Sequence, residues 1–236
     1  KVVPHIHDML DATQPISLNT IRIENLIDDK EFIQFKTSQK KEKKRILITG
    51  GSGYIGTHLT EMLLTDGYQV VLLDNHIYGK HGIEHLQNHE NLTIVHGDIA
   101  NIKDVVKSLK NVDTIIALAA IVGDPACGID PQETLNLNYE ASKVLIETAN
   151  FYGIQRLVFA SSCSVYGMSG DNLLTETSPL NPVSLYAKTR IMSENTLFER
   201  ANNVSPVVLR LSTVFGYSPR MRFDLVVNLL TVKALV

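Results

Sequence analysis

The chain has 236 residues, enough for one large domain or about one and a half. Apolar residues make up 44% and charged residues 20%, and the net charge of −3 gives no basic excess for binding nucleic acid. No apolar run reaches the roughly 18 residues that a membrane span needs, so neither nucleic acid nor a membrane is expected as a partner.

Residues 1–45 differ in composition from the rest and are expected to form an N-terminal arm. The charged run "KTSQKKEKKR" (36–45) is typical of a linker, and the apolar residues between 23 and 33 could share one face of a short helix. No metal site is expected, because the residues near the start that are metal ligands by type are interpreted as a solvated terminus: His5, His7 and Asp8.

The two cysteines, Cys127 and Cys163, show no CxxC or disulfide pattern. We therefore expect a reducing, cytoplasmic environment in which both side chains are small buried hydrophobes. The sequence starts at Lys1 without a visible signal peptide, so its native start is treated as undefined.

From residue 45 onward, short apolar runs alternate with segments of helical length. The apolar runs are 45–49, 69–74, 91–98, 112–120, 156–162 and 206–212, and the helical segments are 54–66, 101–109, 132–152 and 184–202. Continuous apolar runs are typical of strands covered on both faces. The alternation predicts an α/β domain over 46–236, with a doubly wound parallel sheet of Rossmann type.

The segment "TGGSGYIG" (49–56) follows the first predicted strand and opens the first predicted helix. Glycines at this turn allow a pyrophosphate to approach the backbone, and the helix N-terminus supplies free N–H donors. Asp74 ends the second predicted strand, where a carboxylate can accept both ribose hydroxyls and would repel a 2′-phosphate. The pattern therefore predicts NAD as the cofactor, in preference to NADP.

Further motifs recur at the ends of the later strands and in the helices. They are Gly97-Asp98, Ala119-Ala120, Asn138, "SSCSVYG" at 161–167 and Tyr186 within "VSLYAKTRIMSE" at 183–194. Together with the glycine turn, they resemble the extended short-chain dehydrogenase/reductases, specifically the NAD-dependent epimerase/dehydratase group that acts on nucleotide sugars. The resemblance covers about residues 45–236.

This resemblance implies a set of cofactor-binding residues and a catalytic pair. The cofactor set is Gly50, Gly53, Tyr54, Ile55, Gly56, Asp74, Asn75, Asp98, Ile99, Leu118, Ala119, Ala120, Asn138, Tyr186 and Arg190. The implied reaction is hydride transfer at a sugar carbon, in which Tyr186 as phenolate takes the hydroxyl proton and Ser162 hydrogen-bonds the same oxygen.

Arg190 departs from the family, which has a lysine four residues after the tyrosine. A free tyrosine has a pKa near 10, so a phenolate at neutral pH needs a neighbouring cation. Arginine keeps the charge but is bulkier and does not give up a proton. An active enzyme, a weak enzyme and an inactive NAD-binding protein all remain open, and Lys188 is expected to point about 200° away from Tyr186 around the helix.

The resemblance also places substrate contacts near the catalytic pair. Dehydratases of the family carry an acidic pair where this chain has Cys163 and Ser164, so an epimerase or a net reductase is favoured over a dehydratase. Thr213 stands where many epimerases place a substrate-binding asparagine. Asp124 could contact the substrate or form a turn with the proline that follows it.

The resemblance implies that the chain ends early relative to the family, and we expect only the start of a smaller substrate domain. An exposed apolar helix is expected near this end, containing Leu225, Val226, Leu229 and Leu230. The resemblance implies a homodimer through the helices near 132–152 and 184–202. The alternative function is a non-catalytic NAD-binding module attached through the charged linker.

Overall fold

The computed structural model describes residues 44–168 and 173–235. The helix expected between residues 23 and 33, the ligand-type residues near the start and most of the charged linker lie outside these ranges. The described part begins with a strand directly after the charged run.

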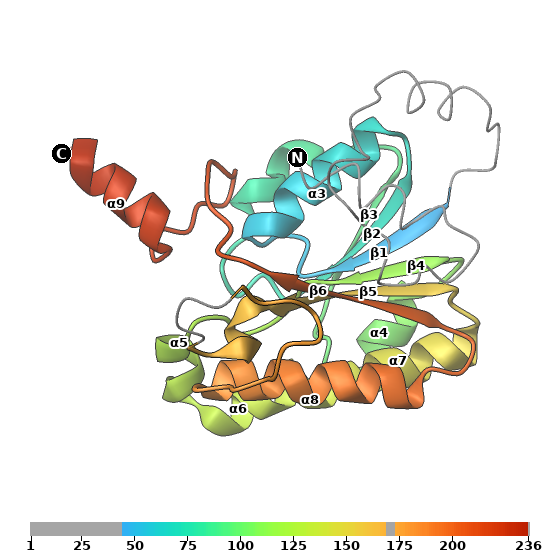
Figure 1. The fold of residues 1–236 in the computed structure, drawn as a ribbon. Helices are drawn as coiled ribbons and strands as arrows, with labels where there is room; N and C mark the ends of the chain where they lie inside the picture. Colours follow the sequence, from blue (N-terminus) through green and yellow to red (C-terminus); the bar gives the residue numbers. More distant parts are fainter. Residues whose placement is uncertain (1–43, 169–172, 236) are drawn as a thin grey trace, which may run out of the picture. The chain divides into compact units, whose positions relative to one another are not determined.

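Within the described residues, six parallel strands form one twisted sheet (Figure 1). The strands are β1 (Arg45–Thr49), β2 (Gln69–Asp74), β3 (Leu92–His96), β4 (Thr114–Ala117), β5 (Arg156–Ser162) and β6 (Ser205–Leu211). Their order is β3-β2-β1-β4-β5-β6, which is the order of the doubly wound dinucleotide-binding fold and confirms the expected fold class.

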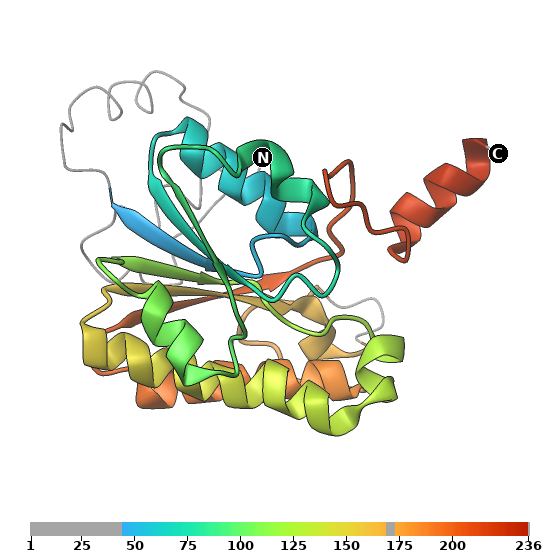
Figure 2. The same cartoon turned by 180° about the vertical axis from the view of Figure 1, so that it is seen from behind.

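Helices cover the sheet from both sides. Helix α3 (Tyr54–Thr65) lies on one face, and α4 (Ile102–Ser108), α7 (Ala141–Tyr152) and α8 (Leu185–Arg200) lie on the other (Figure 1). Figure 2 shows α4 and α7 side by side under the sheet from behind. Shorter elements connect them: η2 (His81–Leu86), α5 (Asp124–Ile129), α6 (Pro131–Leu135), η3 (Asn136–Glu140) and η4 (Cys163–Tyr166).

The core on the α7 side combines alternate strand residues with apolar residues of the helices. Leu47, Ile115 and Leu157 are fully buried there and pack with Ile146 and Ala149 of α7. Because successive strand side chains point to opposite faces, Ile46 and Ile48 lie on the other side of β1 and are also fully buried. The central strands are therefore covered on both faces, as their apolar runs predicted.

Two strands depart from that prediction. Strand β3 exposes Thr93, Ile94 and His96, and every residue of β6 is partly exposed. Both are edge strands of the sheet, and each has a neighbouring strand on one side only. The prediction that the apolar runs at 91–98 and 206–212 are buried on both faces was therefore wrong.

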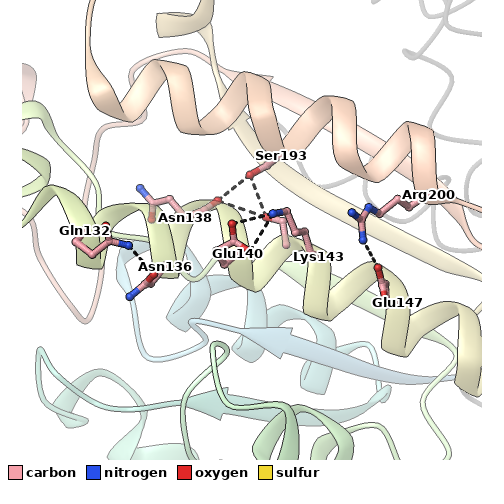
Figure 3. Close-up of polar contacts among 9 residues, drawn as sticks. Gln132, Asn136, Asn138, Glu140, Lys143, Glu147, Ser193 and Arg200 are labelled. Carbon is pink, nitrogen blue, oxygen red and sulfur yellow. Dashed lines mark hydrogen bonds and ion pairs between the residues drawn. The ribbon is translucent and has the colours of Figure 1, made fainter.

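The predicted helix 132–152 is divided into α6, η3 and α7. Element η3 is a π-helical turn, in which one extra residue widens the helix. The widened turn lies opposite α8, where Figure 3 shows Ser193 directed toward Asn138. This interruption was not predicted, because the apolar periodicity of the segment continues through it.

The C-terminal helix α9 (Val226–Leu235) extends away from the sheet (Figure 1). Its exposed side chains include Val226 at 56% and Leu230 at 59%, and Asn228 is its buried residue. The expected exposed apolar helix is therefore present. No helix in the described ranges is long and apolar enough to cross a membrane.

Candidate functional site

A cleft of about 520 Å³ lies along the carboxyl edge of the sheet. Its walls come from the ends of β1, β2, β4 and β5, from the first turns of α3 and α8, and from the segment that follows β6. In doubly wound sheets this edge is where ligands bind, at the point where the strand order reverses. Here that point lies between β1 and β4, and the carboxyl ends of both strands line the cleft.

The glycine turn brings the start of α3 to the cleft. Gly50 has φ +75°, and a Cβ there would lie 2.7 Å from the Ala119 nitrogen at the end of β4. A Cβ on Gly56 would lie 2.4 Å from the Gly50 oxygen. Both glycines are therefore required by the chain's own backbone packing, which draws the turn against the sheet.

The N-terminus of α3 fits an anionic group. Its N-cap, Gly53, supplies no side-chain hydrogen bond to the first turn, and Gly53, Tyr54 and Ile55 line the cleft. The first-turn N–H groups of a 12-residue helix thus lie at the cleft surface without a side-chain cap. This is the arrangement that a cofactor pyrophosphate requires.

Asp74 stands at the end of β2 with both carboxylate oxygens hydrogen-bonded to the backbone. Oδ2 accepts from the Ser52 N–H at 2.9 Å, and Oδ1 accepts from the His76 N–H at 2.8 Å. Each oxygen retains a lone pair for a further donor, such as a ribose hydroxyl. The two bonds hold the carboxylate at the cleft edge, next to the glycine turn.

Nearly all the predicted site residues meet in this cleft. Those that line it are Gly50, Gly53, Tyr54, Ile55, Gly56, Asp74, Asn75, Asp98, Ile99, Leu118, Ala119, Ala120, Ser162, Cys163, Ser164, Tyr186, Arg190 and Thr213. Two predicted residues, Asn138 and Asp124, are not part of its lining. Asp124 is exposed at the first position of the short helix α5, where the proline follows it.

Asn138 lies behind the cleft wall and is 1% exposed. Its side-chain oxygen accepts from the Ile121 N–H at 2.8 Å, and its amide nitrogen donates to the Ile121 oxygen at 2.8 Å. Its main-chain oxygen, in the widened turn, accepts from Ser193 Oγ at 2.7 Å (Figure 3). Asn138 therefore joins the loop after β4 to α8.

Ser162 and Tyr186 approach the cleft from two different elements. Ser162 is the last residue of β5, and its Oγ accepts from the Ser164 N–H at 3.1 Å. Tyr186 is the second residue of α8, a helix whose N-cap Ser184 accepts from the Ala187 N–H at 3.2 Å. Both residues line the cleft.

Arg190 is 2% exposed and is held by main-chain oxygens. Nη1 donates to Ala160 O at 3.3 Å and Nη2 donates to Asn138 O at 3.2 Å. The guanidinium carbon lies 5.3 Å from the centre of the Tyr186 ring, so a positive charge stands beside the phenol. Burial lowers the pKa of Arg190, and the nearby Tyr186 opposes this shift.

The Nε atom of Arg190 differs from its two terminal nitrogens. Nε is buried, and no hydrogen bond to it is found among the described residues, although the residue lines the cleft. An unpaired buried N–H is costly, so this atom fits a site completed by a hydroxyl or a water from the cleft. Lys188, which was expected to point away from Tyr186, is exposed.

The two cysteines differ in environment, which corrects the expectation that both are buried. Cys127 is 1% exposed, and burial raises the pKa of its thiol. Cys163 is exposed and lines the cleft directly after Ser162. It starts the short element η4, which turns the chain out of the sheet and exposes the side chain.

Arg220 and Tyr78 are cleft residues that the sequence did not reveal. The Arg220 guanidinium lies 4.5 Å from the centre of the Tyr78 ring, and both line the cleft. The segment carrying Arg220 is anchored on α3, since Tyr54 OH donates to Gly216 O at 2.6 Å and Ser218 Oγ donates to Tyr54 O at 2.8 Å. Neither residue belongs to a motif with recognisable spacing in this sequence.

The comparisons with known proteins agree with this geometry. The model of the NAD dependent epimerase/dehydratase family matches residues 46–231. The chain belongs to this family. The family match confirms the resemblance predicted from the motifs, and the strand order confirms the predicted fold class.

Curated relatives within the family include decarboxylases and epimerases. UDP-glucuronic acid decarboxylase 1 of Xenopus tropicalis is 32% identical over 86% of this chain and 49% of its own length. UDP-glucose 4-epimerase of Bacillus subtilis is 32% identical over 75% of this chain and 55% of its own length. The chain thus spans about half the length of the curated relatives it matches.

Solved structures of the family resemble the described fold. UDP-glucuronic acid 4-epimerase from Bacillus cereus, in complex with UDP-glucuronic acid and NAD, is 30% identical with a TM-score of 0.73, covering 81% of this chain and 63% of that one. UDP-N-acetylglucosamine 4-epimerase from Methanobrevibacter ruminantium is 33% identical with a TM-score of 0.70, covering 78% and 59%.

Proposed function

We propose that this chain provides the NAD-binding and catalytic half of an epimerase, or a closely related oxidoreductase, that acts on a nucleotide sugar. One observation carries the proposal. The glycine turn, Asp74, Ser162 and Tyr186 line a single cleft, with the Arg190 charge beside the phenol. Relatives that hold NAD and UDP-sugars support the same assignment.

In the proposed cofactor site, the start of α3 holds the pyrophosphate and Asp74 accepts the hydroxyls of the adenosine ribose. Asp98 and Ile99 border the adenine end, and Leu118 and Ala119 border the middle of the cleft. The nicotinamide end then lies toward Tyr186, where bound NAD supplies a hydride acceptor that can later return the hydride.

The chain's own residues handle the proton. Tyr186, as phenolate, takes the proton of a sugar hydroxyl. The carbon that bears this hydroxyl loses its hydrogen as hydride, and a ketone forms. Ser162 Oγ donates a hydrogen bond to the reacting oxygen. Return of the proton from Tyr186, with hydride delivery to the other face of a turned ketone, gives the epimer. Delivery of the hydride to the original face of the ketone regenerates the substrate.

The sugar end of the cleft favours epimerisation or reduction over dehydration. Cys163 and Ser164 occupy the positions after Ser162, and neither is a strong general acid or base for removing water from a sugar ring. Ser164 Oγ is buried and has no partner among the described residues, so it fits a substrate hydroxyl. Thr213 lines the same region and is proposed as a further contact.

The second candidate function is a non-catalytic or weakly active NAD-binding module. The position of Arg190 favours it, because two of its nitrogens are already occupied by main-chain oxygens. A lysine at this position could move within the cleft, whereas the planar guanidinium is fixed in the wall.

Turnover assays separate the two candidates. A full-length form is incubated with NAD and a panel of UDP-, GDP-, CDP- and dTDP-sugars, and the products are followed by chromatography and NMR. The epimerase proposal requires interconversion of at least one sugar, and its loss in Tyr186→Phe. No turnover by the wild-type protein, with activity appearing in Arg190→Lys, would instead establish the non-catalytic module.

We also propose that the chain forms a homodimer through α7 and α8. Phe151 and Phe198 project from these helices and are 84% and 53% exposed. A second copy of the same surface would bury them by helix packing. Light scattering on wild type and Phe198→Glu tests the proposal: a dimer should become a monomer, and a monomeric wild type would exclude it.

A further inference from the structure

A partly buried ion pair lies near Ser162 and takes no part in the proposed chemistry. Glu194 of α8 is 4% exposed, and Arg210 of β6 donates to it through two nitrogens. Arg210 Nη2 donates to Glu194 Oε2 at 2.7 Å, and Nε donates to both carboxylate oxygens, at 3.2 Å to Oε1 and 3.1 Å to Oε2. Such a side-on contact fixes the carboxylate in orientation as well as in distance.

Each partner also contacts a residue that flanks Ser162 in the chain. Ser161 Oγ donates a hydrogen bond to Glu194 Oε1. Arg210 Nη1 donates to Tyr166 OH at 2.8 Å. The ion pair therefore holds the residue before Ser162 and the residue four positions after it, where η4 ends.

Strand geometry turns the first contact into a constraint on Ser162. Successive side chains of a strand point to opposite faces, and Ser162 is extended, with φ −145° and ψ 145°. Ser161 and Arg210 are also aligned in the register of β5 with β6. Because Ser161 and Ser162 are adjacent in the strand, fixing Ser161 Oγ against Glu194 restricts the backbone from which the Ser162 side chain projects.

The same pair connects this segment to the helix that carries the tyrosine. Glu194 lies eight residues after Tyr186 in α8, which is about 12 Å along the helix axis. The hydrogen bond to Glu194 raises the pKa of Arg210, so the arginine remains charged. A charged, side-on pair is stiffer than a single neutral hydrogen bond.

We infer that Ser161, Tyr166, Glu194 and Arg210 are positioning residues that set Ser162 relative to Tyr186. The inference rests on the proposed function, since it assigns Ser162 to the reacting oxygen. The four residues act through Ser162 and are not themselves assigned to proton or hydride transfer.

The test uses two variants that each remove one contact and leave the ion pair in place. Ser161→Ala removes the hydroxyl that Glu194 holds, and Tyr166→Phe removes the hydroxyl that Arg210 holds. Ser108→Ala is the matched control, because Ser108 is a buried serine that donates to Asp104 O at 2.8 Å in α4, away from the cleft.

The first measurement is amide exchange by NMR, which needs no activity. The Ser164 N–H is bonded to Ser162 Oγ, so its exchange reports where that hydroxyl points. We expect about tenfold faster exchange at Ser164 in Ser161→Ala, and no change there in the control. Unchanged exchange at Ser164 in a folded Ser161→Ala variant would overturn the inference.

The second measurement is the kinetics of full-length variants on any sugar that the wild type turns over. We expect kcat to fall about 10- to 100-fold in both variants, with KM and NAD affinity within about twofold. A variant that loses only thermal stability, to the same extent as the control, would show a purely structural role and overturn the inference. Absence of wild-type turnover would remove the proposed function, and amide exchange would then decide the positioning role alone.

Discussion

Replacing Arg190 by lysine separates the two tasks that the structure gives this side chain. The guanidinium donates to Ala160 O and Asn138 O, and it also places a positive charge 5.3 Å from the centre of the Tyr186 ring. A lysine ammonium keeps the charge but cannot reproduce the planar fork that reaches both oxygens. Stability and activity should therefore respond differently.

The stability effect follows from the loss of one buried hydrogen bond. Asn138 O would still accept a hydrogen bond from Ser193. Ala160 O is therefore the acceptor that mainly loses its hydrogen bond with the arginine. A buried hydrogen bond from a charged donor contributes about 1.5–3 kcal/mol. For a domain of this size that corresponds to a decrease in Tm of roughly 3–12 °C.

The activity effect follows from the charge. We take the 5.3 Å between the guanidinium carbon and the centre of the Tyr186 ring as the separation of the two charges. At an effective dielectric constant of about 20, the positive charge then contributes roughly 3 kcal/mol, or about 100-fold in rate. Arg190→Lys should therefore keep turnover within about tenfold of wild type, while Arg190→Met should lose about 100-fold. The exposed Lys188 supplies the control, because Lys188→Met should change neither property.

Thermal denaturation by circular dichroism and initial rates on the full-length enzyme measure the two effects. An unchanged or higher Tm in Arg190→Lys would show that the carbonyl contacts do not stabilise the fold. Turnover of Arg190→Met within about threefold of wild type would show that the phenol does not depend on this cation, and the electrostatic reasoning would fail.

Three further outcomes are expected. Asp74→Ala should weaken NAD binding at least about tenfold by calorimetry, because two ribose hydrogen bonds are lost, and an affinity within about twofold would refute the cofactor placement. Gly50→Ala should abolish NAD binding, since its Cβ would lie 2.7 Å from a backbone nitrogen, whereas Gly123→Ala, where φ is +90° but nothing lies within 4 Å, should cause only a modest loss of stability. Iodoacetamide should label the exposed Cys163 rapidly, and substrate should protect this residue. It should label the buried Cys127 only on unfolding, because burial raises the pKa of that thiol. Mass spectrometry follows the two labelling rates, and equal rates would contradict this prediction.

Local sequence patterns were sufficient for the fold and for most of the cleft. Alternating strands and helices predicted a parallel sheet, and in such a sheet the carboxyl ends of all strands lie at one edge. Residues at the carboxyl ends of the strands must therefore gather there, which explains why Gly50, Asp74, Ala119 and Ser162 all line the cleft. The positions of Tyr186 and Arg190 followed from their phase at the start of a helix.

Other features depend on contacts between residues far apart in the chain. The burial of β3 and β6 was overestimated, because an apolar run does not show whether its strand is at the edge of the sheet. The widened turn at Asn138 and the contact of Arg220 with Tyr78 have no periodic signature either.

Sequence alone thus determined the family, the fold class and which strand ends line the cleft, because these follow from spacing along one element or from one element to the next. Tertiary structure decided where the Arg190 guanidinium points, what holds Asn138, and how Glu194 and Arg210 meet near Ser162. Those side chains are directed by partners on other elements, and a buried polar group adopts the orientation that satisfies its hydrogen bonds in the packed protein.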